Sequence, residues 1–70
     1  MTLGQYIAEQ RKRAQLNQTQ LGELVALSQS QVSRIELGES QPSIRQLVAL
    51  SEALGFDLAE AVKIPVKLVA

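Results

Sequence analysis

The stretch from Asn17 to Gly38, NQTQLGELVALSQSQVSRIELG, decides the fold of this 70-residue chain. Asn17 suits a helix N-cap with Gln20 as its capping-box partner, and Ser28 repeats this arrangement with Gln31. Apolar residues at helical spacing follow the two caps: Leu21, Leu24 and Val25, then Val32 and Ile35. Gly38 is typical of a helix end. The stretch therefore predicts two short helices joined by a tight turn.

The second of these expected helices has one apolar and one polar face. Because successive residues turn by about 100° around a helix axis, Val32 and Ile35 share one side. The other side carries short polar side chains and one cation: Gln29, Ser30, Ser33 and Arg34. Glutamine can bond adenine and arginine can bond guanine through two atoms each in the DNA major groove, while serine reaches a base or a phosphate. We therefore expect DNA base contacts from Gln29, Ser30, Gln31 and Arg34.

The same region resembles the helix-turn-helix of the phage repressor and Cro-type (XRE-like) DNA-binding domains. These residues carry the resemblance: Asn17, Gln18, Leu21, Gly22, Val25, Ser28 to Glu36, Gly38, Pro42, Ser43, Leu47, Leu50 and Ala53 to Gly55. It covers most of the chain, from residue 3 to residue 58. It implies an all-α, compact, lambda-repressor-like domain of four to five helices, which we expect over residues 1–61.

Two positions, one in the turn between the paired helices and one in the helix before it, bear on the geometry of the pair. The family often has glycine after the first helix, where φ is positive, and Ala26 stands there in this chain. We expect slight backbone strain at Ala26. Gly22 is a poor helix residue, by about 1 kcal/mol relative to alanine, and we expect it to permit close approach of the second helix.

The resemblance also implies contacts outside the base-reading face. Arg11 matches an arginine that pairs with the glutamate at Glu36 and braces the first helix against the recognition helix. For the run from Arg11 to Arg13, the alternative is a solvated helix end, and Lys12 or Arg13 could instead approach a phosphate. The family's docking geometry predicts DNA backbone contacts from residues around the two helices: Gln18, Ser28, Ser33, Ser40, Gln41 and Arg45. For Ser40, Gln41 and Arg45, which flank Pro42, helix capping and solvation are the alternative roles.

Three further helices are expected, one before this pair and two after it. Thr2 can cap a first helix over Thr2–Ala14, and Ser43 can cap a fourth that ends at Gly55. Asp57 can cap a short fifth helix over Leu58–Val62.

Residues 62–70 carry a different pattern. Apolar residues alternate as in a strand: Val62, Ile64, Val66 and Leu68. Pro65 confines such a strand to an edge, and a lone strand on a helical domain would pair with the same strand of a second copy. We therefore expect a homodimer interface from Phe56, Leu58, Val62, Ile64, Val66 and Leu68. A disordered tail is the alternative.

Composition excludes several classes of function. The chain has no cysteine and no histidine, which removes disulfides, the commonest metal ligands and thiolate or imidazole catalysis. We expect no enzyme, no cofactor, no metal and no small-molecule ligand. No signal peptide or membrane-spanning run is visible, so a cytoplasmic protein is expected. The formal net charge is zero, which counts against non-specific nucleic-acid binding.

Three functions fit these features. The first is a transcriptional repressor that binds double-stranded DNA by sequence, as a homodimer on an inverted repeat. The second is an antitoxin that regulates its own operon and has a cognate toxin as its protein partner. The third is a helical adaptor that has lost DNA binding, which only the zero net charge favours.

Overall fold

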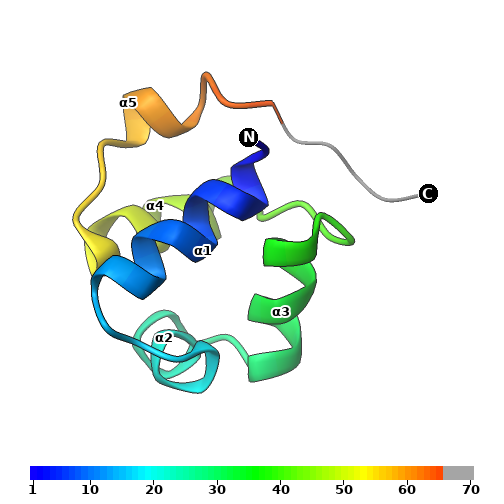
Figure 1. Ribbon diagram of the computed structural model, residues 1–70, viewed down its shortest axis with the longest axis vertical. Coiled ribbons are helices and arrows are strands. Elements are labelled where there is room, and N and C mark those ends of the chain that lie inside the picture. Colours follow the sequence, from blue (N-terminus) through cyan, green and yellow to red (C-terminus); the bar gives the residue numbers. More distant parts are fainter. Residues whose placement is uncertain (66–70) are drawn as a thin grey trace.

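Five helices form the part of the chain that the structure describes. The structure is a computed structural model in which residues 1–65 are described, and its helices are α1 (Leu3–Arg13), α2 (Gln18–Val25), α3 (Gln29–Leu37), α4 (Ile44–Leu54) and α5 (Leu58–Ala61) (Figure 1). α3 packs on α1 and α2, whereas α4 packs on α1, α2 and α5. The expected all-α fold of four to five helices is confirmed.

Each of the four longer helices begins with a reciprocal capping box. The cap side chain accepts from the backbone N–H three residues later, and a glutamine at that position accepts from the N–H of the cap. The pairs are Thr2–Gln5, Asn17–Gln20, Ser28–Gln31 and Ser43–Gln46. Such a cap stabilises a helix by about 1 kcal/mol. Asp57 caps α5 by accepting a 2.9 Å bond from the N–H of Ala59, and Gly38 and Gly55 end α3 and α4, as the sequence predicts.

The core is aliphatic, with one aromatic pair at its edge. Its most deeply buried large side chains are Ile7, Leu21, Val32 and Leu50. Burial of one such side chain contributes about 1.5–3 kcal/mol. Tyr6 and Phe56 pack edge to face with their ring centroids 5.3 Å apart. Among residues 1–65 no helix has the length and apolar character needed to cross a membrane.

The turn between α2 and α3 depends on Gly22 and Ala26. Ala26 has φ 58° and ψ 41°, the left-handed conformation that favours glycine, so the expected strained position is confirmed. The N–H of Leu27 donates to the carbonyl of Gly22 at 2.9 Å. A Cβ atom at Gly22 would lie 2.3 Å from the Leu27 carbonyl oxygen. Gly22 therefore makes room for the backbone of the turn that leads into α3, rather than for α3 itself.

A second close approach joins α1 to α3 and has no obvious signal in the sequence. A Cβ atom at Gly4 would lie 2.3 Å from the carbonyl oxygen of Ile35 and 2.7 Å from that of Glu36. The first turn of α1 therefore touches the backbone of the last turn of α3. This contact fixes how far α3 stands from the body of the domain.

The end of the described chain does not form the expected strand. Val62 is the C-cap of α5, and the N–H groups of Lys63 and Ile64 donate to the carbonyls of Glu60 and Ala61 at 3.2 and 3.1 Å. The carbonyl of Pro65 then accepts a 3.0 Å bond from the N–H of Leu3. The strand prediction is therefore wrong over residues 62–65, because these bonds hold a turn and join the segment to the start of α1.

The predicted dimer residues differ in how far they are buried within one chain. Phe56 is only 9% exposed and belongs to the core, and Leu58 and Ile64 are half-buried against that core. The Phe56 ring packs on Tyr6 within one chain, and its role as a dimer contact stays a prediction. Val62 remains 58% exposed. Val66 and Leu68 lie outside the described residues.

Candidate nucleic-acid interface

α3 presents its polar side chains to solvent and its apolar side chains to the core. Val32 and Ile35 are 1% and 4% exposed, respectively. The predicted base-contacting residues are all exposed: Gln29, Ser30, Gln31 and Arg34. Ser33, one of the predicted backbone contacts, is half-buried beside them. Figure 1 shows α3 at one side of the molecule, with its outer surface uncovered by the other helices.

An ion pair between Arg11 and Glu36 connects α1 to α3. Arg11 Nε donates to Glu36 Oε2 at 2.7 Å, and Nη2 donates to Oε1 at 3.0 Å. The side chains are only 11% and 6% exposed, and Arg11 Nη1 also donates to the carbonyl of Leu16 at 2.8 Å. The hydrogen bond to Glu36 raises the pKa of Arg11, against an opposing effect of desolvation. The guanidinium therefore stays charged at neutral pH, and the bidentate pair fixes the spacing of the two helices.

A chain of hydrogen bonds continues from this pair to the surface of α3. Glu36 Oε1 also accepts from Gln18 Nε2 at 3.0 Å. Gln18 Oε1 in turn accepts from Gln29 Nε2 at 2.6 Å. Gln18 and Gln29 are the first residues of α2 and α3, so this amide–amide bond aligns the starts of the two helices. The sequence gives no direct signal for it beyond a glutamine at the first position of each helix.

The other predicted contact residues lie around both ends of α3. Ser28 and Gln31 are joined through the capping box, with Gln31 Oε1 accepting from the Ser28 N–H at 2.8 Å. The hydroxyl of Ser28 and the carbonyl oxygen of the Gln31 amide are therefore already engaged. Beyond the C-terminal end of α3, Gln41 and Arg45 are exposed and Ser40 is half-buried. Both groups flank the exposed face of α3.

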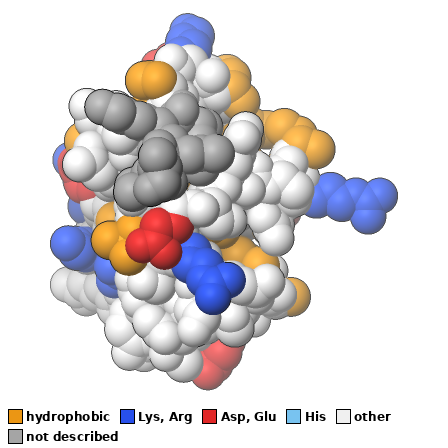
Figure 2. Space-filling model, turned by 90° about the vertical axis from the view of Figure 1, so that its right-hand side faces the viewer, with side chains coloured by type: hydrophobic (Ala, Val, Ile, Leu, Met, Phe, Trp, Pro, Cys, Tyr) orange, Lys and Arg blue, Asp and Glu red, His pale blue; other side chains and the backbone are white. Residues whose placement is uncertain are grey.

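Half of the six basic side chains in the described chain already have acidic partners. Arg11 pairs with Glu36, Arg13 with Glu9 at 3.0 Å, and Lys63 with Glu60 at 3.8 Å. Within residues 1–65 three cations form no ion pair: Lys12, Arg34 and Arg45. Figure 2, which looks onto the side of the molecule where α3 lies, shows scattered charges on a mainly uncharged surface. Attraction of a polyanion to this face therefore depends on a few single side chains.

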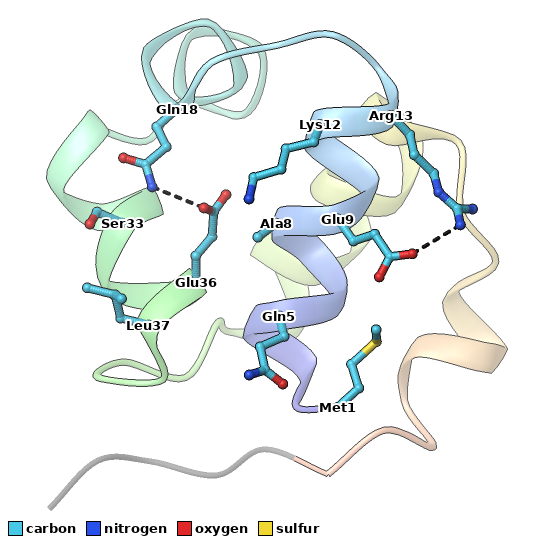
Figure 3. Close-up of a pocket in the computed structure, with 10 residues that line it drawn as sticks. All are labelled: Met1, Gln5, Ala8, Glu9, Lys12, Arg13, Gln18, Ser33, Glu36 and Leu37. Atoms are coloured by element: carbon cyan, nitrogen blue, oxygen red, sulfur yellow. Dashed lines mark hydrogen bonds and ion pairs between the residues drawn. The ribbon is translucent and has the colours of Figure 1, made fainter.

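A groove of about 760 Å³ runs between α1 and α3 (Figure 3). Its lining includes the predicted contacts Gln18 and Ser33, the carboxylate of Glu36, and Lys12 from α1. Met1, Ala8 and Leu37 are its apolar lining residues. Sequence periodicity predicts that both helices exist but not the space left between them, so the groove is found only in the structure.

A family model described as a helix-turn-helix domain matches residues 2–62 of the chain. The chain belongs to the helix-turn-helix family. The match includes all five described helices, and the relatives below confirm the phage repressor type. A helix-turn-helix domain of this type is a regulatory module and not an enzyme.

This helix-turn-helix domain is similar to repressors and regulators of known sequence or structure. It is 40% identical over 62 residues to the immunity repressor protein of Bacillus phage phi105, a match covering 89% of the chain and 43% of that repressor. The chain thus spans less than half the length of this relative. The P22 c2 repressor in complex with synthetic operator 9T matches with a TM-score of 0.82 and 31% identity, over 87% of the chain and 92% of that repressor chain. Bacillus thuringiensis PlcR in complex with the peptide PapR7 and DNA matches with a TM-score of 0.83 and 33% identity, over 90% of the chain and 22% of PlcR.

Proposed function

We propose that this helix-turn-helix domain binds double-stranded DNA by sequence, with α3 in the major groove, and regulates transcription from the site that it occupies. The observation that carries the proposal is the exposed polar face of α3, held in place by bonds from α1 and α2. The synthetic operator in the P22 c2 repressor complex and the DNA in the PlcR complex support it by similarity.

Gln29 is suited to read adenine without breaking its bond to Gln18. Bidentate recognition of adenine uses one amide N–H and the amide oxygen. The amide nitrogen of Gln29 has two N–H groups, and one of them donates to Gln18. The other N–H and Oε1 form no further hydrogen bond among residues 1–65. The bond to Gln18 therefore holds the amide plane in place before DNA arrives.

The remaining base contacts follow from side-chain chemistry. Arg34 has an exposed guanidinium with no ion pair in the described chain, and we propose that it reads guanine. We propose that the Ser30 hydroxyl and the amide NH₂ group of Gln31 form hydrogen bonds with neighbouring bases. This face carries no carboxylate among Gln29, Ser30, Ser33 and Arg34, so it does not repel the negative phosphates beside the groove.

We propose backbone contacts at both ends of α3. The caps of α2 and α3 are neutral and the first turns contain no acidic residue, so the positive ends of the helix dipoles are not neutralised. Phosphate binding at such helix starts is favourable, which supports contacts from Gln18 and Ser28. Ser33 lies further along α3, where it lines the groove beside Gln18. Exposed polar or basic side chains support a second set beyond α3: Ser40, Gln41 and Arg45.

We further propose that the domain acts as a homodimer on an inverted repeat. Support comes from an apolar hollow of about 260 Å³ between α4, α5 and Leu3, with the exposed side chains of Ile44 and Val62 on its rim. Ile44 is 67% exposed. Burial of this apolar surface against a second copy would favour association, and two-fold symmetry would place the half-sites about one helical turn of DNA apart.

The mode of regulation that we propose is repression by occupying a promoter. The immunity repressor and the P22 c2 repressor are named as repressors, which supports this mode by similarity. The antitoxin alternative needs a second protein. Co-purification of the protein with a larger chain from its own cell would favour that alternative.

A binding titration tests the proposal. Duplexes enriched from a random pool are labelled and titrated at about 50 and 200 mM salt, because DNA binding weakens as salt rises. We expect salt-dependent binding that Gln29→Ala weakens and Gln10→Ala does not. Gln10 is a matched control because it lies on α1 and its side chain forms no hydrogen bond in the described chain. No enrichment of any duplex by the unaltered protein would contradict the proposal.

A further inference from the structure

We propose that the groove between α1 and α3 receives the sugar-phosphate backbone of one DNA strand, with Lys12 as its phosphate-binding cation. The inference rests on the proposed DNA binding and adds a contact from α1, a helix outside the helix-turn-helix pair. The sequence leaves open whether Lys12 or Arg13 approaches DNA. The structure distinguishes these two neighbouring cations.

The two side chains leave α1 in different directions. Both residues line the groove, but in Figure 3 the side chain of Lys12 extends from α1 toward α3, where Gln18 and Glu36 lie, whereas that of Arg13 points toward Glu9. Arg13 forms a 3.0 Å ion pair with Glu9 one turn earlier. Lys12 is exposed and forms no ion pair within residues 1–65.

The side-chain charges that line the groove are paired, except for that of Lys12. Glu36 is neutralised by Arg11, and its two oxygens already accept bonds from Arg11 and Gln18. Glu9 is paired with Arg13. The ammonium of Lys12 is therefore the one side-chain cation of this lining without a partner in the described chain. A phosphate seated here would meet the unpaired side-chain cation of Lys12 and no unpaired side-chain carboxylate.

The polar groups beside Lys12 suit the same ligand. Gln18 and Ser33 line the groove, and Gln18 retains one amide N–H beyond the one that it donates to Glu36. Gln18 is also bonded to Gln29, the proposed adenine reader. A strand whose phosphate meets Lys12 and Gln18 would therefore run beside the bases that α3 reads. Arg45, beyond the other end of α3, is placed to contact a different part of the backbone.

The test compares Lys12→Ala with Arg13→Ala, two variants with the same change in net charge. Affinity for an enriched duplex is measured by fluorescence anisotropy across a series of salt concentrations. We expect Lys12→Ala to weaken binding about 3- to 10-fold at low salt, equally for the enriched duplex and a scrambled one, and to reduce the slope of log K against log salt by about one. We expect Arg13→Ala to leave the slope unchanged. Lys12→Arg should keep most of the affinity because it retains the cation.

Each outcome has a distinct meaning. Equal slopes for Lys12→Ala and Arg13→Ala, with the unaltered protein still binding its duplex, would overturn the inference and leave the proposed function intact. Failure of the unaltered protein to bind any duplex would overturn both. A loss of folding is monitored by circular dichroism, and Lys12 is exposed, so we expect no change in either variant.

Discussion

Gln18 and Gln29, the first residues of α2 and α3, are joined by a 2.6 Å hydrogen bond from Gln29 Nε2 to Gln18 Oε1. Gln18 also donates to Glu36, which is held by Arg11. The proposed base-reading amide is therefore connected to α1 through buried or partly buried groups. Its orientation is set before DNA binds, which reduces the entropy lost on binding.

This connection predicts that Gln18 and Gln29 act together in DNA binding. Gln18→Ala removes the acceptor that orients Gln29. Part of the binding free energy that Gln29 contributes is therefore lost as well. In a double-mutant cycle on affinity for an enriched duplex, we expect a coupling energy of about 0.5–2 kcal/mol between Gln18→Ala and Gln29→Ala. Simple additivity of the two single effects would mean that the bond plays no part in recognition.

Arg34 is expected to carry sequence specificity rather than general attraction. Arg34→Ala should cost about 1–3 kcal/mol on the enriched duplex and much less on a scrambled one, because a bidentate bond to guanine is lost. Lys63→Ala removes the same charge from an exposed side chain paired with Glu60, and serves as the control. Equal losses on both duplexes for Arg34→Ala would assign Arg34 to the phosphates.

Removal of one partner of the Arg11–Glu36 pair should destabilise the fold. Arg11→Met leaves the carboxylate of Glu36 largely buried with only Gln18 as a donor. We expect a loss of about 3 kcal/mol in the free energy of unfolding, measured by urea denaturation. Arg11→Met combined with Glu36→Leu should recover much of that loss, because no unpaired charge remains. A double variant as unstable as the single one would show that packing, and not charge, is responsible.

The turn between α2 and α3 should become more stable with glycine at Ala26. Ala26 adopts φ 58°, where a Cβ atom costs about 1–2 kcal/mol. Replacement by glycine removes this strain, but glycine also increases the conformational entropy of the unfolded chain, which offsets part of the stabilisation. We expect Ala26→Gly to raise the free energy of unfolding by about 0.5–1 kcal/mol. Ala49→Gly, inside α4, should lower it by about 1 kcal/mol. Destabilisation by both changes would show that the strain at Ala26 is relieved in solution.

The proposed dimer surface can be tested by charge insertion. Ile44→Glu places a carboxylate on the rim of the apolar hollow between α4 and α5. We expect it to abolish self-association, measured by sedimentation velocity, and to weaken binding to an inverted repeat. Leu24→Glu is the control, since Leu24 is a similarly exposed apolar residue on α2. Unchanged self-association of Ile44→Glu would locate the dimer contact elsewhere.

Local signals in the sequence are enough to predict most of the helices. A cap residue with glutamine three positions later marks the start of each long helix, and Gly38 and Gly55 mark two ends. These signals are reliable because the bonds they form lie within one turn. The strain at Ala26 is predictable through the family resemblance, which implies a positive φ at this position of the turn.

Features that join distant residues are not visible in the same way. The alternation from Val62 suggests a strand, yet the carbonyl of Pro65 bonds the N–H of Leu3, which lies at the opposite end of the chain. Gly4 looks ordinary in the sequence, and only the structure shows the backbone of α3 against it. The direction of Lys12 and the bond between Gln18 and Gln29 likewise depend on how whole helices pack.

Parallel selection of duplexes with the unaltered protein and with Gln29→Ala tests most directly whether the outer face of α3 reads DNA. We expect the unaltered protein to enrich a defined motif from a random pool, and Gln29→Ala to enrich the same motif with one adenine position relaxed. An identical motif from both proteins, or no motif from the unaltered one, would contradict the assignment of α3 as the reading helix.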